Sequence, residues 1–224
     1  DHIKVFGNKN YKSFNYNVPG DISSSAFFIV LTILSKNSKI LIKNVNINPT
    51  RIGVVRILKM MGAKITFKNI KEYKGEKIAN ISVKSTSSLK SINCPTEFNS
   101  SSIDEFLIIF LVAAKASGIS YFKDLSELNQ KESPRLIIGS RILTMIGVKN
   151  KLTNNSIKIY GQPNLRLDKT YEVKNFLKDH RVFMMSTIAA LTLGGNWKIH
   201  DQDSINTSFP SFLKIVRKLG GQVN

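Results

Sequence analysis

Three stretches of the chain are apolar on every side, and each is followed by a short run of residues typical of a β-strand. A helix that is apolar all round is usually buried in a protein interior. The predicted buried helices cover residues 23–35, 103–116 and 181–193, and the predicted strands after them cover 39–46, 119–122 and 197–200. The pattern therefore predicts an α/β fold with three helices in its interior.

A more amphipathic segment follows each of these strands and ends at an apolar residue and a glycine. The glycines are Gly62, Gly147 and Gly220, about 80 residues apart, a distance that suits a repeated unit of several elements. The segments before the first two are nearly identical, Arg-Ile-Leu-Lys-Met and Arg-Ile-Leu-Thr-Met. We interpret the chain as three copies of one unit: strand, buried helix, strand, surface helix and strand pair.

The three copies are predicted to cover about 19–95, 96–170 and 171–224, with a strand at 13–18 leading into the first. The expected strand pairs are 63–68 with 79–84 around a polar turn at 69–77, and 148–152 with 156–160. The third copy stops at its glycine signature, so we expect strands from a longer polypeptide to complete it. The predicted fold is an inside-out α/β barrel with pseudo-threefold symmetry and an incomplete third repeat.

Polar residues collect at the predicted helix starts. Asp104 opens the second buried helix, Asn48-Pro49-Thr50 starts the first surface helix, and Ser133 is the expected N-cap of the second, with Pro134 at its first position. Parallel buried helices bring their positive N-terminal ends and free N–H groups together, which favours anions. We therefore expect an anion site formed by residues 104–105, 131–135 and 179–181.

Composition narrows the classes of protein to consider. With 224 residues, 42% of them hydrophobic, the chain can form one large domain or two small ones. Its longest apolar runs are about half of the roughly 20 residues that a membrane span needs, so we predict no membrane partner. The single cysteine, Cys94, excludes an internal disulfide and suits a reducing compartment, which we take to be the cytoplasm.

The net charge of +18 raises nucleic acid as a partner, because basic surfaces bind phosphates. The lysines are spread along the whole chain and accompany a general excess of Asn and Ile. We therefore predict solvated lysine faces and no nucleic-acid partner, with part of the charge serving small anionic substrates.

Six motifs, in order along the chain, resemble those of the 5-enolpyruvylshikimate-3-phosphate (EPSP) synthase family. They are Val-Pro-Gly-Asp-Ile-Ser-Ser-Ser-Ala-Phe-Phe (18–28), Asn-Pro-Thr-Arg (48–51), Ile-Asp-Glu-Phe (103–106), Lys-Glu-Ser-Pro-Arg (131–135), Asp-His-Arg (179–181) and Ser-Phe-Pro (208–210). The resemblance implies two inside-out domains, each of three βαβαββ units, of which this chain is the C-terminal half. It implies that residues 19–224 form the C-terminal enolpyruvyl transferase domain and that 1–18 are the end of the other domain and the crossover.

The resemblance also implies a reaction of the shikimate pathway, which leads to the aromatic amino acids. The enolpyruvyl group of phosphoenolpyruvate is transferred to the 5-hydroxyl of shikimate 3-phosphate, and phosphate is released. No metal or organic cofactor is implied. The partners implied are the two substrates and the missing N-terminal half, in an enzyme that is a monomer when complete.

By position, Asp104 matches the family's aspartate that binds the shikimate hydroxyls and accepts a proton. Lys131 matches the lysine that contacts shikimate 3-phosphate. Glu132 matches the acid that protonates the methylene carbon of phosphoenolpyruvate, a role that needs a raised pKa in a cleft with little water. Taken alone, these residues would be a helix-start acid, a surface lysine and a capping glutamate.

Arg135 and Arg181 match the arginines that hold phosphoenolpyruvate, and a guanidinium suits its carboxylate and phosphate oxygens. His180 is expected to line the cleft. Pro134 departs from the family pattern, which has an aspartate there that supports its arginine neighbours. Thr207 stands where some members have a lysine that contacts phosphoenolpyruvate.

Two alternatives remain open at the level of the sequence. One is the related enolpyruvyl transferase that acts on UDP-N-acetylglucosamine, although Lys-Glu-Ser-Pro-Arg and Asp-His-Arg favour the shikimate enzyme. The other is a non-catalytic module that binds anions or nucleic acid. Because several of the family's substrate-binding residues belong to the other half, we predict negligible activity for this chain alone.

Overall fold

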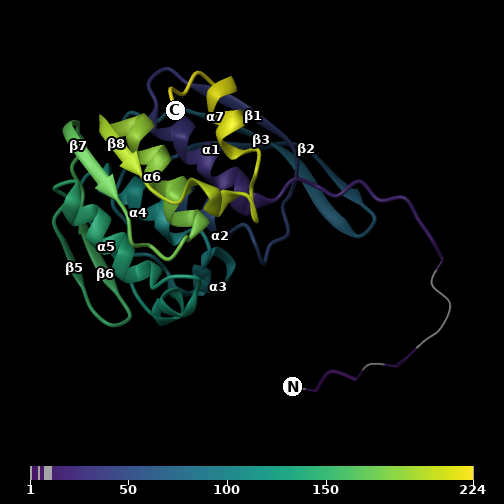
Figure 1. Ribbon diagram of the computed structural model, residues 1–224. Helices are drawn as coiled ribbons and strands as arrows, with labels where there is room; N and C mark the ends of the chain where they lie inside the picture. Colours follow the sequence, from purple (N-terminus) through teal and green to yellow (C-terminus); the bar gives the residue numbers. More distant parts are fainter. Residues whose placement is uncertain (1, 5, 8–11, 224) are drawn as a thin grey trace.

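The computed structural model describes residues 2–4, 6–7 and 12–223, which form a mixed α/β body with an extended N-terminal segment (Figure 1). The elements, in chain order, are α1 (Ile22–Leu34), β1 (Lys39–Asn46), α2 (Gly53–Met60), β2 (Lys64–Tyr73), β3 (Glu76–Lys84), η1 (Thr96–Phe98), α3 (Asn99–Ser102), α4 (Phe106–Ala114), β4 (Ile119–Phe122), η2 (Ser126–Gln130), α5 (Arg135–Met145), β5 (Asn150–Leu152), β6 (Ile157–Tyr160), β7 (Leu167–Val173), α6 (His180–Leu193), β8 (Gly194–Ile199), η3 (Gln202–Ile205) and α7 (Phe212–Lys218).

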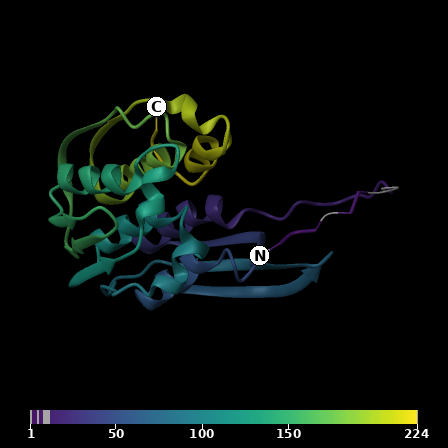
Figure 2. The ribbon, with the colours of Figure 1, turned by 90° about the horizontal axis from the view of Figure 1, so that it is seen from below.

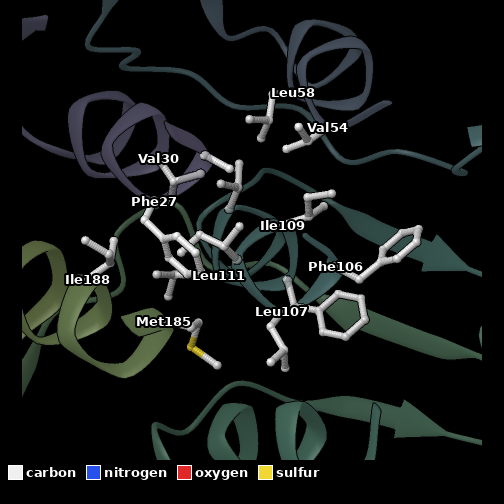
Figure 3. Close-up of a cluster of buried hydrophobic side chains, with 14 of the residues drawn as sticks. Phe27, Val30, Val54, Leu58, Phe106, Leu107, Ile109, Leu111, Met185 and Ile188 are labelled. Carbon is white, nitrogen blue, oxygen red and sulfur yellow. The ribbon is translucent and has the colours of Figure 1, made fainter. Parts of the chain in front are cut away.

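Three helices form the interior, as predicted. Helices α1, α4 and α6 pack against one another, and every residue of α4 is buried. Phe27 of α1, Leu111 of α4 and Ile188 of α6 lie close together in Figure 3. The sheets lie outside these helices, with β1 and β3 against α1, β6 against α4 and β8 against α6. The inside-out α/β arrangement is therefore confirmed.

The three sheets repeat one topology. Their strand orders are β1-β3-β2, β4-β6-β5 and β7-β8. In each, a lead-in segment runs parallel to the strand that follows the buried helix: Gly20 bridges Val45, Lys90 bridges Ser117, and β7 pairs with β8. Lys90 and β7 lie a few residues before the repeat boundaries predicted at 96 and 171. Within residues 12–223 the third sheet has no counterpart of the β3-β2 and β6-β5 pairs.

The three signature glycines end the helices α2, α5 and α7 in the same way. Gly62, Gly147 and Gly220 have φ values of +93°, +78° and +90°, a left-handed conformation that glycine adopts without a Cβ clash. The residue after each glycine donates its N–H back across the helix end, to Leu58, Leu143 and Val216 at 2.9, 2.8 and 3.0 Å. This repeated cap confirms that one unit occurs three times.

Two strand predictions were wrong. Residues 13–18 form no strand; the N–H of Asn17 donates to the Tyr73 hydroxyl at 3.1 Å, and the rings of Tyr16 and Tyr73 lie 5.3 Å apart. The polar turn expected at 69–77 is instead strand up to Tyr73 and again from Glu76, with the turn at Lys74 and Gly75. The β2–β3 ribbon consequently projects from the body (Figures 1 and 2).

Three helix starts also differ from prediction. The Asn48 side chain accepts the Thr50 N–H at 3.0 Å in a local turn, and α2 begins only at Gly53. The Ser133 hydroxyl does not cap α5, which begins at Arg135, because it donates to Asp179 at 2.8 Å. Helix α4 begins at Phe106, and the Asp104 carboxylate points to arginines instead of capping it.

Lysines that are dispersed in the sequence are grouped by the sheet register. Lys84 of β3 lies opposite Lys39 of β1 on one side and Lys64 of β2 on the other. All three are exposed, and none has an ion pair within the described part of the chain. Like charges directly across a sheet repel one another, so this row of lysines destabilises the fold locally.

No helix of the described residues has the length and apolar character needed to cross a membrane.

Candidate active site

The N-terminal ends of the three buried helices meet at one end of the body. Asp179 is the N-cap of α6 and accepts the Arg181 N–H at 2.9 Å, while Glu105 stands at the N-cap position of α4. Arg181 donates from Nη1 to the Asp104 carbonyl at 3.0 Å, which joins the starts of α6 and α4. Arg51 donates to Ser23 in the first turn of α1 at 2.9 Å. The predicted convergence of helix starts is therefore present.

Arg135 is the most deeply buried basic group of the site, with 1% of its side chain exposed. Its Nε donates to Asp179 at 2.8 Å, its Nη1 to Asp104 at 3.2 Å, and its Nη2 to Glu132 and to Asp179. A guanidinium with three carboxylate partners is firmly oriented. Arg135 is therefore fully paired although position 134 is a proline and supplies no acid. Asp179 is its principal partner.

Asp179 was included in the expected anion site as part of the Asp-His-Arg motif, but the sequence assigned it no role of its own. It is fully buried and accepts hydrogen bonds from Arg135, from the Ser133 hydroxyl and from the Arg181 N–H. Burial alone raises the pKa of this carboxyl, but the hydrogen bond and charge of Arg135, together with Ser133 and Arg181, bring its pKa below the ordinary value. Asp179 is therefore ionised at neutral pH and fixes both arginine segments.

Arg181 is held less tightly than Arg135. Apart from its bond to the Asp104 carbonyl, its guanidinium lies 3.7 Å from the Asp104 carboxylate and 3.6 Å from that of Glu105. These are ion-pair distances, longer than hydrogen bonds. With 13% of its side chain exposed, Arg181 retains N–H groups that can turn toward an anion.

Lys131, Asp104 and Glu132 form the open part of the site. Lys131 pairs with Glu127 at 2.7 Å and lies 3.8 Å from Asp104. Lys131 and Asp104 are each 23% exposed and Glu132 is 53% exposed. The carboxylates that the resemblance assigns to proton transfer therefore border solvent in this chain.

His180 occupies the first helical position of α6, between Asp179 and Arg181. Burial lowers the pKa of its imidazole, and the charge of Arg181 lowers it further, against the opposing effect of Asp179 and Glu132. The ring is therefore mainly neutral at pH 7. All six residues predicted for the site thus lie at this end of the body, five of them joined by direct contacts and His180 next to them.

The site offers arginine, lysine and carboxylate groups but no cluster of metal ligands. Within residues 2–4, 6–7 and 12–223, no three His, Cys, Asp or Glu side chains are arranged to hold a metal ion. Paired arginines and a lysine next to carboxylates suit the binding of an anionic substrate and the transfer of protons at a neighbouring atom.

A model of the family described as EPSP synthase (3-phosphoshikimate 1-carboxyvinyltransferase) matches residues 1–216 of the chain. The chain belongs to the EPSP synthase family. It is 37% identical over 226 residues to the 3-phosphoshikimate 1-carboxyvinyltransferase of Ruthia magnifica subsp. Calyptogena magnifica, covering 99% of this chain and 50% of that protein. It is 36% identical over 217 residues to the enzyme of that name from Bacillus cereus, covering 97% and 49%.

Solved structures give the same assignment. EPSP synthase from Acinetobacter baumannii superposes with a TM-score of 0.88 at 34% identity, covering 92% of this chain and 47% of that one. The enolpyruvyl transferase NikO from Streptomyces tendae superposes with a TM-score of 0.69 at 14% identity, covering 90% and 43%, and supports the fold alone. The chain thus spans about half the length of the relatives that it matches, and the recognition as an EPSP synthase family member is confirmed.

Proposed function

We propose that the chain is the C-terminal half of a 3-phosphoshikimate 1-carboxyvinyltransferase. The complete enzyme transfers the enolpyruvyl group of phosphoenolpyruvate to the 5-hydroxyl of shikimate 3-phosphate in the shikimate pathway. The observation that carries the proposal is a cluster of contacts at the starts of α4, α5 and α6. It joins Asp104, Lys131, Glu132, Arg135 and Arg181. Family membership supplies the reaction, and the site supplies groups of the required chemistry.

The proposed roles follow the chemistry of each group. Asp104 binds the shikimate hydroxyls and accepts the proton of the 5-hydroxyl, and Lys131 binds the phosphate of shikimate 3-phosphate. Glu132 delivers a proton to the methylene carbon of phosphoenolpyruvate. Arg181 binds a carboxylate or phosphate oxygen of phosphoenolpyruvate, with His180 lining the cleft.

Arg135 has a double role in this proposal. Its guanidinium donates from Nη1 to Asp104 and from Nη2 to Glu132, so one side chain holds both carboxylates. To bind phosphoenolpyruvate as well, Arg135 must exchange at least one carboxylate for a substrate oxygen. We place the orientation of Asp104 and Glu132 first among its contributions, because its side chain is only 1% exposed.

The chain alone is proposed to be nearly inactive. A carboxylic acid that protonates carbon needs a site shielded from water, and Glu132 is 53% exposed here. A second domain closing over this end would provide the shielding. We also propose that residues 19–224 are one enolpyruvyl transferase domain, that 1–18 belong to the crossover and the other domain, and that the complete enzyme is a cytoplasmic monomer.

The third sheet supports the division into two halves. A hollow of about 670 Å³ lies beside β8, between α6 and α7. Its lining includes Thr187, Trp197 and Leu213. Within the described residues β8 pairs only with β7, whereas β1 and β4 each pair with an antiparallel strand, β3 and β6. We infer that the hollow beside β8 takes the place of the missing strand pair. Strands from another part of a longer polypeptide would fill this hollow and complete the pseudo-threefold barrel.

The proposal is tested by phosphate release from phosphoenolpyruvate and shikimate 3-phosphate. The chain is assayed alone and mixed with a matching N-terminal half, with Asp104→Ala as the inactive variant and Asp168→Ala, an exposed acid of β7, as its matched control. We expect turnover only in the mixture, its loss with Asp104→Ala and its retention with Asp168→Ala. No turnover with both halves folded, even after Pro134→Asp, would refute the function; full turnover by the chain alone would refute the shared site.

A further inference from the structure

Glu105 is a buried carboxyl in the site to which no role has been given. It follows Asp104 in the Ile-Asp-Glu-Phe motif and stands at the start of α4, with 3% of its side chain exposed. Its Oε1 is buried and has no hydrogen-bond partner in the described part of the chain. A buried carboxylate oxygen without a partner destabilises a fold. A residue retained at such a cost, among groups that bind anions, is a candidate for function.

Three charged groups and one serine surround Glu105, and they come from four segments. Arg181 of α6 lies 3.6 Å from Oε1, and Asp104 precedes Glu105 in the chain. Ser23 of α1 lies near the carboxyl and accepts a hydrogen bond from Arg51, which lies beyond it. Burial raises the pKa of Glu105, and Asp104 adds to the rise, while Ser23, Arg181 and Arg51 oppose it. The balance depends on Arg181, which is the nearest positive charge.

The same guanidinium is the loosely held anion-binding group of the site. Arg181 shares its N–H groups between the Asp104 carbonyl, at hydrogen-bond distance, and two carboxylates at 3.6 and 3.7 Å. An anion that binds Arg181 competes with these carboxylates for the same N–H groups. It also brings a second negative charge close to Glu105 in an environment of low dielectric constant.

We propose that Glu105 is a positioning residue for Arg181, aiming the guanidinium when the site is empty and taking up a proton when an anionic substrate group binds it. The proton comes from solvent, binds the carboxylate of Glu105 and returns to solvent when the anion leaves. Asp104 differs from Glu105 in that it is more exposed and is paired with Arg135 as well. The inference rests on the proposed function for the identity of the substrate, but not for the proton uptake.

The test measures proton uptake on anion binding by isothermal titration calorimetry of this chain. Sulfate is the probe, because it does not titrate between pH 5 and 8, so any proton taken up belongs to the protein. The binding enthalpy is compared in buffers of different ionisation enthalpy. At pH 6 we expect a net uptake of protons on sulfate binding by the wild-type chain.

Two variants identify the group that takes up the proton. Glu105→Gln keeps the size and the hydrogen-bonding capacity of the side chain, and we expect it to bind sulfate with no proton uptake. His180→Gln removes the titratable imidazole next to Arg181 in the chain, and we expect its proton uptake per bound sulfate to equal that of the wild type. Uptake that survives Glu105→Gln, or that disappears in His180→Gln, would overturn the proposal, as would the absence of sulfate binding by the wild-type chain.

A second measurement does not depend on the folding of a variant. In the wild-type chain with carbon-13-labelled glutamate carboxyls, the apparent pKa of Glu105 is followed by NMR with and without saturating sulfate. We expect sulfate to raise it, and an unchanged value would refute the proposal. Failure of the two-substrate turnover assay would leave these results intact, so the proposed function and the role of Glu105 can fail separately.

Discussion

Replacing Asp179 by Asn tests whether the buried ion pair organises the site and the fold. The variant keeps the size of the side chain and an oxygen that can cap α6, since Asn is as good an N-cap as Asp. It removes the negative charge opposite the Arg135 guanidinium, which is 1% exposed. Arg135 donates from Nε to Asp179 at 2.8 Å, and only its contact with Glu132 is shorter. The perturbation is therefore confined to the charge of one buried group.

The magnitude follows from the partners that remain. Removing one member of a buried ion pair costs about 3–5 kcal/mol, because the other charge is left buried. Arg135 keeps Asp104, at 3.2 Å, and Glu132, so we expect the lower end, about 3 kcal/mol. For a chain of this size that corresponds to a fall in melting temperature of roughly 6–12 °C.

The assay is urea unfolding at pH 7, followed by circular dichroism, with Asp203→Asn as the control. Asp203 pairs with Lys178 at 2.7 Å on the surface, and its replacement should leave the unfolding midpoint unchanged. If Asp179→Asn lowers the free energy of unfolding by less than about 1 kcal/mol, the inference that this ion pair holds the site together is wrong.

The effect of pH gives an independent check of the same reasoning. Folding lowers the pKa of Asp179 below its ordinary value of 3.8, so the stabilisation is fully present above that value. It is lost as the pH falls through the lower pKa of the folded state. The difference in stability between the wild type and Asp179→Asn should therefore be constant from pH 7 to about pH 5 and shrink below pH 4.

Three further predictions concern the fold. Lys84→Thr removes the central charge of the lysine row and should raise the free energy of unfolding by about 0.5 kcal/mol. The gain should be smaller in 1 M salt than in 0.05 M salt, and equal gains would exclude a charge effect. Gly147→Ala should lower stability by about 1 kcal/mol through its positive φ alone, since a Cβ there meets no atom within 4 Å, and Gly147→Asn should cost less. Burial raises the pKa of Cys94 to about 11, so a thiol reagent at pH 8 should label it only as fast as the protein unfolds; immediate labelling would contradict its burial.

The sequence predicted those parts of the fold that depend on local pattern. The interior helices could be recognised because a segment such as 106–114 is apolar on all sides and needs no knowledge of its neighbours. The glycine signatures could be recognised because a helix that ends in the left-handed conformation requires a particular residue. Both features repeat, so each copy supported the assignment of the others.

The parts that the sequence did not predict depend on contacts between distant segments. Ser133 has the sequence pattern of a helix cap, but its hydroxyl donates to Asp179, 46 positions later in the chain. The length of the β2–β3 ribbon is set by pairing of residues such as Lys71 with Ile78, in a stretch whose polar composition resembles a turn. The site itself was predicted through the family motifs, and the motifs contain Asp179 and Glu105 without indicating that both are buried partners of arginines.

The distribution of acidic residues distinguishes the site from the rest of this basic chain. Four of the 15 acidic residues lie against the two arginines of the site: Asp104, Glu105, Glu132 and Asp179. In a chain with 33 lysines and arginines, acids placed without function would find surface lysines as partners, as Asp203 does. Here they surround two arginines and hold them in place.

This arrangement has a consequence for how an anion can bind. The positive charge of the remaining surface draws anions toward the protein, but at the site an anion meets arginines whose N–H groups already face carboxylates. Binding must therefore be an exchange, in which a carboxylate gives up its arginine and either moves toward solvent or takes up a proton. Glu132 can move toward solvent, because half of its side chain is exposed. Glu105 is buried, so when Arg181 turns to an anion its carboxylate takes up a proton. The same carboxylates that orient the arginines in the empty site thus link anion binding to proton uptake.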